Sequence, residues 1–152
     1  MRRAGLACAL ACALAVQAAP GEEEDAGLDP DYAGGKQALE AKDWPAAIRL
    51  LNSAALRDTR NADIQNYLGY AHRNSGDLAL AFKHYNRALQ LNPRHRGAHE
   101  YLGEAYLMAG NAAKAREHLE LLGRICLIPC EEYAMLQRKI SAYGAKSESA
   151  GK

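Results

Sequence analysis

The chain has 152 residues, which is long enough for one domain. Its formal net charge is +1, so it has no excess of basic residues for nucleic-acid binding. Arg2 and Arg3 supply two of the 19 basic side chains, so without them 17 basic residues stand against 18 acidic ones. This balance excludes the basic amphipathic face of a membrane-surface helix. Abundant Ala and Leu favour helix over strand.

Residues 1–18 have the three parts of a secretory signal peptide. Met1 to Arg3 form a positive start, Ala4 to Val16 an uncharged apolar run, and Val16 and Ala18 stand at −3 and −1 of a cleavage point. The run is shorter than the roughly 20 apolar residues of a transmembrane helix. We therefore expect a bacterial protein, periplasmic or secreted, with no stable membrane insertion after cleavage. A lipid-anchored chain and an uncleaved apolar helix are alternatives.

Two polar segments flank the central domain, residues 28–143. The stretch 19–27 is acidic and contains Gly, which predicts a disordered linker. The stretch 144–152 is small and polar, which predicts a disordered tail.

The central domain repeats itself at a fixed spacing, a period of about 34 residues. This spacing separates the members of several sets: Gly35, Gly69 and Gly103; Ala47, Ala81 and Ala115; Ala54 and Ala88; Leu51, Tyr85 and Leu119; Leu68 and Leu102. A period of this length with these residues resembles the tetratricopeptide repeat (TPR). The resemblance divides the domain into repeats 28–61, 62–95 and 96–129. It implies an all-α solenoid of three antiparallel helix pairs, A and B, with a capping helix over residues 131–143.

The second repeat matches the family best, with Leu68, Gly69, Ala81, Tyr85, Ala88 and Pro93 at the family's positions. The first repeat departs from the pattern, because Gly34 replaces the usual Leu and Thr59 the usual Pro. We expect Gly69 on helix A to face Ala81 on helix B, since close packing offsets the roughly 1 kcal/mol that Gly costs in a helix. Gly76 and Asp77 predict the turn between these helices.

The resemblance implies a concave groove, lined by the A helices, that holds an extended peptide or a partner's helix. The residues at inward-pointing positions that are predicted to bind the partner are Tyr32, Lys36, Asn66, Tyr67, Tyr70, Arg73, Asn74, Tyr101 and Glu104. The inward-pointing positions also include Glu40, Asp63, Glu100, Leu107 and Met108. Tyrosine is enriched at binding surfaces, and the asparagines could hydrogen-bond a peptide backbone. The alternative is that Tyr67 and Tyr101 only pack between A helices.

One known binding mode of the family is not expected here. Some TPR proteins grip a C-terminal carboxylate with a set of Lys, Asn and Arg residues. In this sequence Tyr32, Tyr67, Gly97 and Tyr101 stand at several of those positions. We therefore do not expect a clamp for the C-terminal tail of a chaperone.

Cys126 and Cys130 are the cysteines that remain after cleavage. An even count in an oxidising compartment favours a disulfide, which would tie the cap helix to the last repeat. A metal site and a redox centre stay open as alternatives, although no other Cys or His is close in sequence and redox pairs are usually separated by two residues rather than three.

The sequence holds no catalytic motif of the Ser-His-Asp, phosphate-loop or paired-carboxylate kind. We expect the five histidines (His72, His84, His95, His99 and His118) to lie on the surface. The prediction is a non-enzymatic adaptor, without cofactor or metal, that binds another protein or peptide. The alternatives are a thiol- or metal-dependent protein that uses Cys126 and Cys130, and a structural subunit of an envelope complex. No pattern indicates the oligomeric state.

Overall fold

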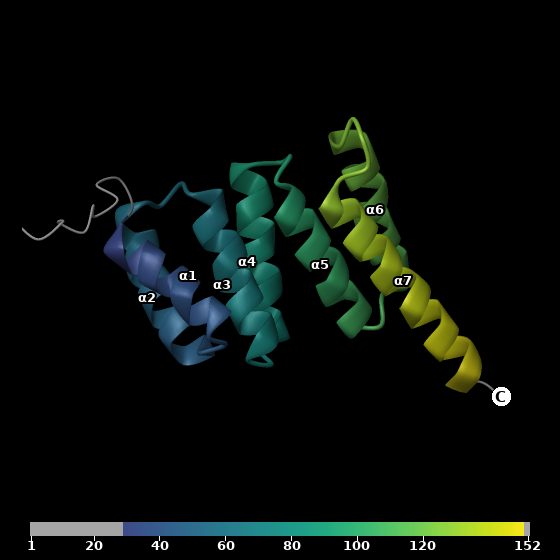
Figure 1. Cartoon of the computed structure of the whole chain (residues 1–152), viewed down its shortest axis with the longest axis horizontal. Coiled ribbons are helices and arrows are strands. Elements are labelled where there is room, and N and C mark those ends of the chain that lie inside the picture. The colour runs from purple at the N-terminus through teal and green to yellow at the C-terminus, as the bar shows by residue number, and fades with distance from the viewer. Residues whose placement is uncertain (1–28, 151–152) are drawn as a thin grey trace, which may run out of the picture.

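The computed structural model describes residues 29–150, which form seven helices and no strand (Figure 1). The helices are α1 Pro30–Glu40, α2 Trp44–Arg57, α3 Ala62–Asn74, α4 Leu78–Leu91, α5 Arg96–Met108, α6 Ala112–Ile125 and α7 Glu131–Ala150. The all-α solenoid is confirmed. The predicted signal peptide and acidic linker lie outside the described residues. From residue 29 to 150, no helix is both long and apolar enough to span a membrane.

The helices stack in consecutive pairs, each pair packing on the next, so that the molecule is elongated (Figure 1). Within a pair the contacts are most extensive, as between α3 and α4 or α5 and α6. The odd-numbered helices α1, α3, α5 and α7 also contact one another in succession along one side. This arrangement brings the A helices of different repeats together on one surface.

The turns inside the pairs follow the sequence pattern. Gly76 and Gly110 have φ values of +90° and +75°, a backbone region that glycine enters without strain. The next residue caps the following helix: the side chain of Asp77 accepts a hydrogen bond from the Leu80 backbone N–H. In the first repeat Lys42 takes this place at φ 58°, so its turn carries a non-glycine residue in the left-handed region.

Helix glycines let the two helices of a pair approach closely. A Cβ added to Gly69 would lie 2.6 Å from Cδ1 of Tyr85, and one added to Gly35 would lie 2.7 Å from Cγ of Leu51. The side chain closest to Gly69 therefore belongs to Tyr85, one helical turn beyond the expected Ala81. The expected repeat alanines at 47, 81, 88 and 115 are fully buried. Pro93 follows the end of α4 as predicted.

The third repeat differs, because α7 supplies the side chain opposite its glycine. A Cβ on Gly103 would lie 2.6 Å from Cδ2 of Leu136, which is fully buried and follows Leu102 by one repeat period. The predicted end of α7 at Tyr143 is wrong, since the helix continues to Ala150 and replaces most of the expected disordered tail. Ala, Lys and Glu after Gly144 favour helix, and no Pro interrupts them.

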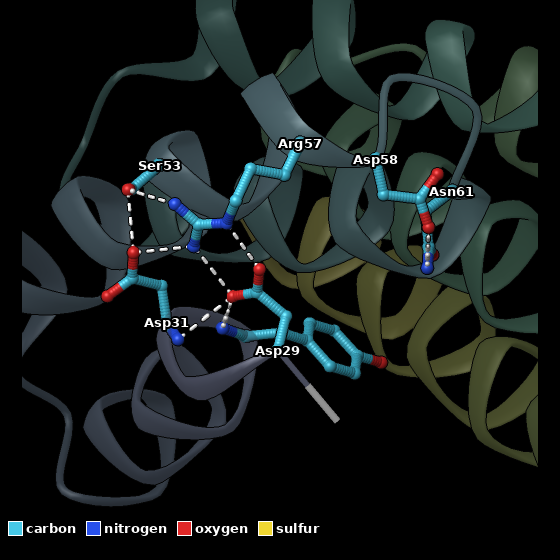
Figure 2. A network of polar contacts seen from close by, with 7 residues as sticks. Asp29, Asp31, Ser53, Arg57, Asp58 and Asn61 are labelled. Atoms are coloured by element: carbon cyan, nitrogen blue, oxygen red, sulfur yellow. Dashed lines mark hydrogen bonds and ion pairs between the residues drawn. The ribbon is translucent and has the colours of Figure 1, made fainter. Parts of the chain in front are cut away.

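A polar network ties the first turn of α1 to the end of α2 (Figure 2). The Arg57 guanidinium pairs with Asp29 and, at 2.6 Å, with Asp31, and the Ser53 hydroxyl donates to Asp31 at 2.6 Å. Asp29 also caps α1 by accepting hydrogen bonds from the backbone N–H groups of Asp31 and Tyr32. The hydrogen bond from Arg57 is the main reason that the pKa of Asp29 is lowered to about 2.

Candidate functional site

A groove of about 920 Å³ lies between α3, α5 and α7 and is here called the main groove. Its lining combines tyrosines, methionines and charged side chains. It is lined by Tyr70, Arg73 and Asn74 of α3, by Glu100, Tyr101, Glu104, Leu107 and Met108 of α5, and by Met135, Lys139, Tyr143 and Lys146 of α7.

A second hollow of about 590 Å³, the adjoining groove, continues towards the N-terminal ends of the same helices. It is lined by Asp63, Asn66 and Tyr67 of α3, by residues 92, 94 and 95 of the α4–α5 loop, by Arg96 and Gly97 of α5, and by Glu131 and Glu132 of α7. Glu100, Tyr101 and Met135 line both grooves and mark their junction.

Seven of the nine predicted groove residues line one or both hollows: Asn66, Tyr67, Tyr70, Arg73, Asn74, Tyr101 and Glu104. Tyr32 and Lys36 do not. The Tyr32 ring packs against Tyr67, with centroids 6.0 Å apart, and the Lys36 ammonium lies 5.8 Å from the centre of the Tyr32 ring. The contact of the first repeat with the grooves is therefore indirect.

The floor of the main groove is built around Arg73. Its guanidinium forms an ion pair with Glu104 of the next repeat and lies 5.4 Å from the ring centres of both Tyr70 and Tyr101. The side chains of Arg73 and Glu104 are only 9% and 12% exposed. A buried pair of this kind holds two repeats in register because either charge alone would be left unpaired.

The tyrosines pack between A helices and also face the groove. Tyr70 packs edge-on against Trp44, with centroids 6.0 Å apart, and against Tyr101 at 5.1 Å. Burial is the main cause that raises the pKa of Tyr101 to about 12. Tyr101 therefore has both of the roles considered from the sequence, since its ring packs between the A helices and also lines both grooves.

Two buried polar groups that line the adjoining groove lack hydrogen-bond partners for their acceptor oxygens within the described chain. The Glu100 side chain belongs to a residue that is 7% exposed, and within residues 29–146 no hydrogen bond or ion pair reaches its carboxylate. Burial is the main cause that raises its pKa to about 7, and the carboxylates of Glu104 and Glu132 add to the effect. Asn66 is 4% exposed, and its Oδ1 accepts no hydrogen bond within the described chain.

The predicted set lacked the third wall of the main groove. Met135, Lys139 and Tyr143 come from α7, a helix that the repeat pattern predicts only as a cover for the solenoid end. The repeat spacing contained the signal, since Tyr67, Tyr101 and Met135 are separated by that period. Continuing the repeat register into the last helix would have identified Met135.

The expectation of surface histidines is wrong for His72 and His99, which are buried, and for His84, His95 and His118, which are half-buried. His84 Nδ1 lies 2.9 Å from Oε1 of Gln65, and its ring stacks on His72 with centroids 5.3 Å apart. Imidazole offers an apolar ring and polar edges, so it fills the space between helices A and B. Burial is the main cause that lowers the pKa of His84 and His118 to about 4.

Cys126 and Cys130 lie between α6 and α7 with their sulfur atoms 2.08 Å apart, at disulfide-bonding distance. Leu127 and Ile128, which lie between the two cysteines in the sequence, are exposed to solvent. No group of three or more metal-ligating side chains occurs within the described residues.

Comparisons with known proteins identify the repeats. Two models of the tetratricopeptide repeat match residues 32–94 and 73–140, which together span most of the described chain. No curated protein matches.

Similar solved structures include the first TPR domain of human RPAP3, with 20% identity, a TM-score of 0.69, and coverage of 78% of this chain and 93% of that one. The Yersinia enterocolitica type III secretion chaperone SycD, in complex with a peptide of the translocator YopD, has 16% identity, a TM-score of 0.65, and coverage of 80% and 92%. PcrH, in complex with the chaperone binding region of PopD, has 19% identity, a TM-score of 0.65, and coverage of 80% and 97%.

Proposed function

The chain belongs to the tetratricopeptide repeat family, and on this premise we propose that it is an exported, non-enzymatic adaptor that binds a segment of a partner protein in the main groove. The observation that carries the proposal is the composition of this groove. The exposed Met108, aromatic rings and charged side chains line it together, as in sites that hold a peptide.

The comparisons support a peptide as the ligand. SycD, which shares the fold, is in complex with a peptide of the translocator YopD, and PcrH is in complex with the chaperone binding region of PopD. Their identity to this chain is only 16% and 19%, so they support the class of ligand and not a particular partner.

Export is the second part of the proposal and rests on residues 1–18. Their positive start, apolar run and small residues before the cleavage point are typical of a signal peptide. The proximity of the Cys126 and Cys130 sulfurs fits an oxidising compartment. Mass spectrometry of the protein from its native host should find a chain that begins near Ala19, and an intact Met1 would contradict export.

Site-specific photo-crosslinking in the native host tests the binding site. A photoreactive amino acid at Met108, which is 60% exposed and lines the main groove, should capture a partner. The matched control is Leu56 on α2, which is 83% exposed and outside both grooves.

The comparison of the two positions decides the outcome. Capture at 108 but not at 56 supports the groove, provided that the captured species disappears when Tyr70 is also replaced by alanine. Capture of the same species from position 56 alone would place the interface on the opposite surface and contradict the proposal.

A further inference from the structure

We propose that the grooves select a peptide with a lysine or arginine side chain, whose cationic head binds Glu100 and Asn66 in the adjoining groove, where it meets the main groove. The inference rests on the proposed function and adds the chemistry of the ligand. It starts from the buried Oδ1 atom of Asn66, which accepts no hydrogen bond within the described chain, and from Glu100, a residue that is 7% exposed and forms no ion pair among residues 29–146.

Glu100 is the first of these groups. A carboxylate that is largely removed from water requires a cation or several hydrogen-bond donors to stay ionised. Burial raises the pKa of Glu100 and the charge of Arg73 lowers it, but Arg73 is already paired with Glu104. Arg96 likewise pairs with Glu132, and the carboxylates of Glu104, Glu132 and Glu131 add negative charge around Glu100. A bound ammonium or guanidinium group would satisfy the Glu100 carboxylate.

Asn66 is the second group, and it approaches Glu100 from the opposite wall. Gly97 stands one helical turn before Glu100 on α5, and a Cβ added to Gly97 would lie 3.3 Å from Nδ2 of Asn66. The missing side chain therefore lets Asn66 pack against α5 at a point one helical turn from Glu100. The Asn66 Oδ1 atom accepts hydrogen bonds only, so the ligand group at this point must be a donor.

The surroundings fit the long stem of a basic side chain. Tyr101 and Met135 line both grooves beside Glu100 and offer an aromatic ring and a thioether. Lysine and arginine bury an aliphatic stem against such surfaces while the charged head reaches a polar partner. An acidic side chain would meet the Glu100 carboxylate and be repelled, so the charge of the site separates the two classes.

Selection from a random library tests the inference without a known partner. Phage that display random 12-residue peptides are selected on the full chain and, in parallel, on its Glu100→Gln variant. We expect lysine or arginine to be enriched at one position of the peptides that bind the unaltered protein, and this enrichment to be lost with Glu100→Gln. The latter keeps the shape of the side chain and removes its charge.

Synthetic peptides then measure the pairing. Replacing the enriched basic residue by glutamine should weaken binding to the unaltered protein by about 30-fold or more, the effect of breaking a buried charge pair. The same replacement should change binding to Glu100→Gln by less than about threefold. Fluorescence anisotropy of labelled peptides gives both dissociation constants, and circular dichroism checks that the variant is folded.

The possible outcomes separate the two proposals. Peptides that bind in the groove without any preference for a basic residue would overturn the inference and leave the proposed function standing. A basic preference that is equal in Glu100→Gln would also overturn it. A failure to select any peptide that competes at the groove would count against both.

Discussion

The Nδ1 atoms of His99 on α5 and His118 on α6 lie 3.0 Å apart between the two helices of the third repeat. The second repeat has the same contact at the same place, since Gln65 and His84 precede them by one repeat period and pair at 2.9 Å. The side chain that meets the histidine of helix B is therefore a non-titratable Gln65 in the second repeat and a titratable His99 in the third.

This equivalence predicts a pH effect on stability. The pKa of His99 is lowered by burial and that of His118 is lowered to about 4, so the folded chain resists protonation that the unfolded chain accepts near pH 6.5. The contribution of the two neutral imidazoles to the unfolding free energy is complete above pH 6.5 and is lost as the pH falls towards 4. His99→Gln should reduce the loss of unfolding free energy between pH 7 and pH 5 by about 1 kcal/mol, after a discount for partial exposure.

Urea unfolding followed by the fluorescence of Trp44, the single tryptophan, gives the free energies. Glu100, whose pKa is raised to about 7, stabilises the fold as the pH falls and therefore opposes the histidines. Glu100 is present in the unaltered protein and in His99→Gln, so the difference between the pH dependences of their unfolding free energies isolates the effect of the histidine pair. An unchanged pH dependence in His99→Gln would contradict the prediction.

Two helix glycines predict opposite effects of the same substitution. Gly69→Ala should lower the unfolding free energy by about 1–3 kcal/mol, because its Cβ would overlap the Tyr85 ring at 2.6 Å. Gly34→Ala should raise it by about 0.5–1 kcal/mol, since its Cβ would lie 3.4 Å from the Leu50 side chain, an ordinary contact, and Ala is the better helix former. Urea denaturation of both variants measures the effects. A neutral Gly69→Ala would show that α3 and α4 separate without penalty.

The groove predicts a binding effect for Tyr70. Tyr70→Ala should weaken the binding of a groove peptide by about 2 kcal/mol, the size of a hot-spot truncation, because Tyr70 lies between Trp44, Arg73 and Tyr101. Lys83→Ala, at an exposed position on α4 outside both grooves, serves as the control and should change binding by less than about 0.5 kcal/mol. Calorimetric titration measures both. Equal losses in two folded variants would exclude the groove as the binding site.

The cysteine pair predicts the thiol content of the mature chain. Protein from an oxidising compartment should show no reactive thiols when unfolded without reductant, and two after reduction, because an even count of cysteines in such a compartment favours a disulfide, here between Cys126 and Cys130. Replacing both by serine should lower the unfolding free energy by about 2 kcal/mol, given the short loop. Two reactive thiols in the native protein would instead favour the thiol- or metal-dependent alternative.

The repeat pattern was sufficient for the positions of the helix pairs. Gly76 and Asp77 mark a turn, and Pro93 a helix end, through local backbone preferences that are visible in the sequence. The partner of Gly69 was harder to predict. Ala81 and Tyr85 lie on the same face of α4, and only the distance between the packed helices decides which of them meets the glycine.

The site was only partly predictable for a related reason. Residues on α3 and α5 were identified because the family pattern assigns them to a surface. The residues on α7 became part of the groove through the packing of that helix against α5. The burial of His99 and of Glu100 likewise depends on neighbours contributed by other helices, which no local pattern contains.

The succession of neighbouring contacts has a consequence for how the chain acquires its structure. Each helix packs only on helices near it in sequence, so the loops that must close during folding are short and the entropy lost in closing them is small. The first three helices already enclose a core cluster of their own, with Leu51, Ile64 and Leu68 among its members. A chain that emerges N-terminus first, during synthesis or export, can therefore form this first core before α5, α6 and α7 have emerged. Each later helix can then pack on helices that are already folded.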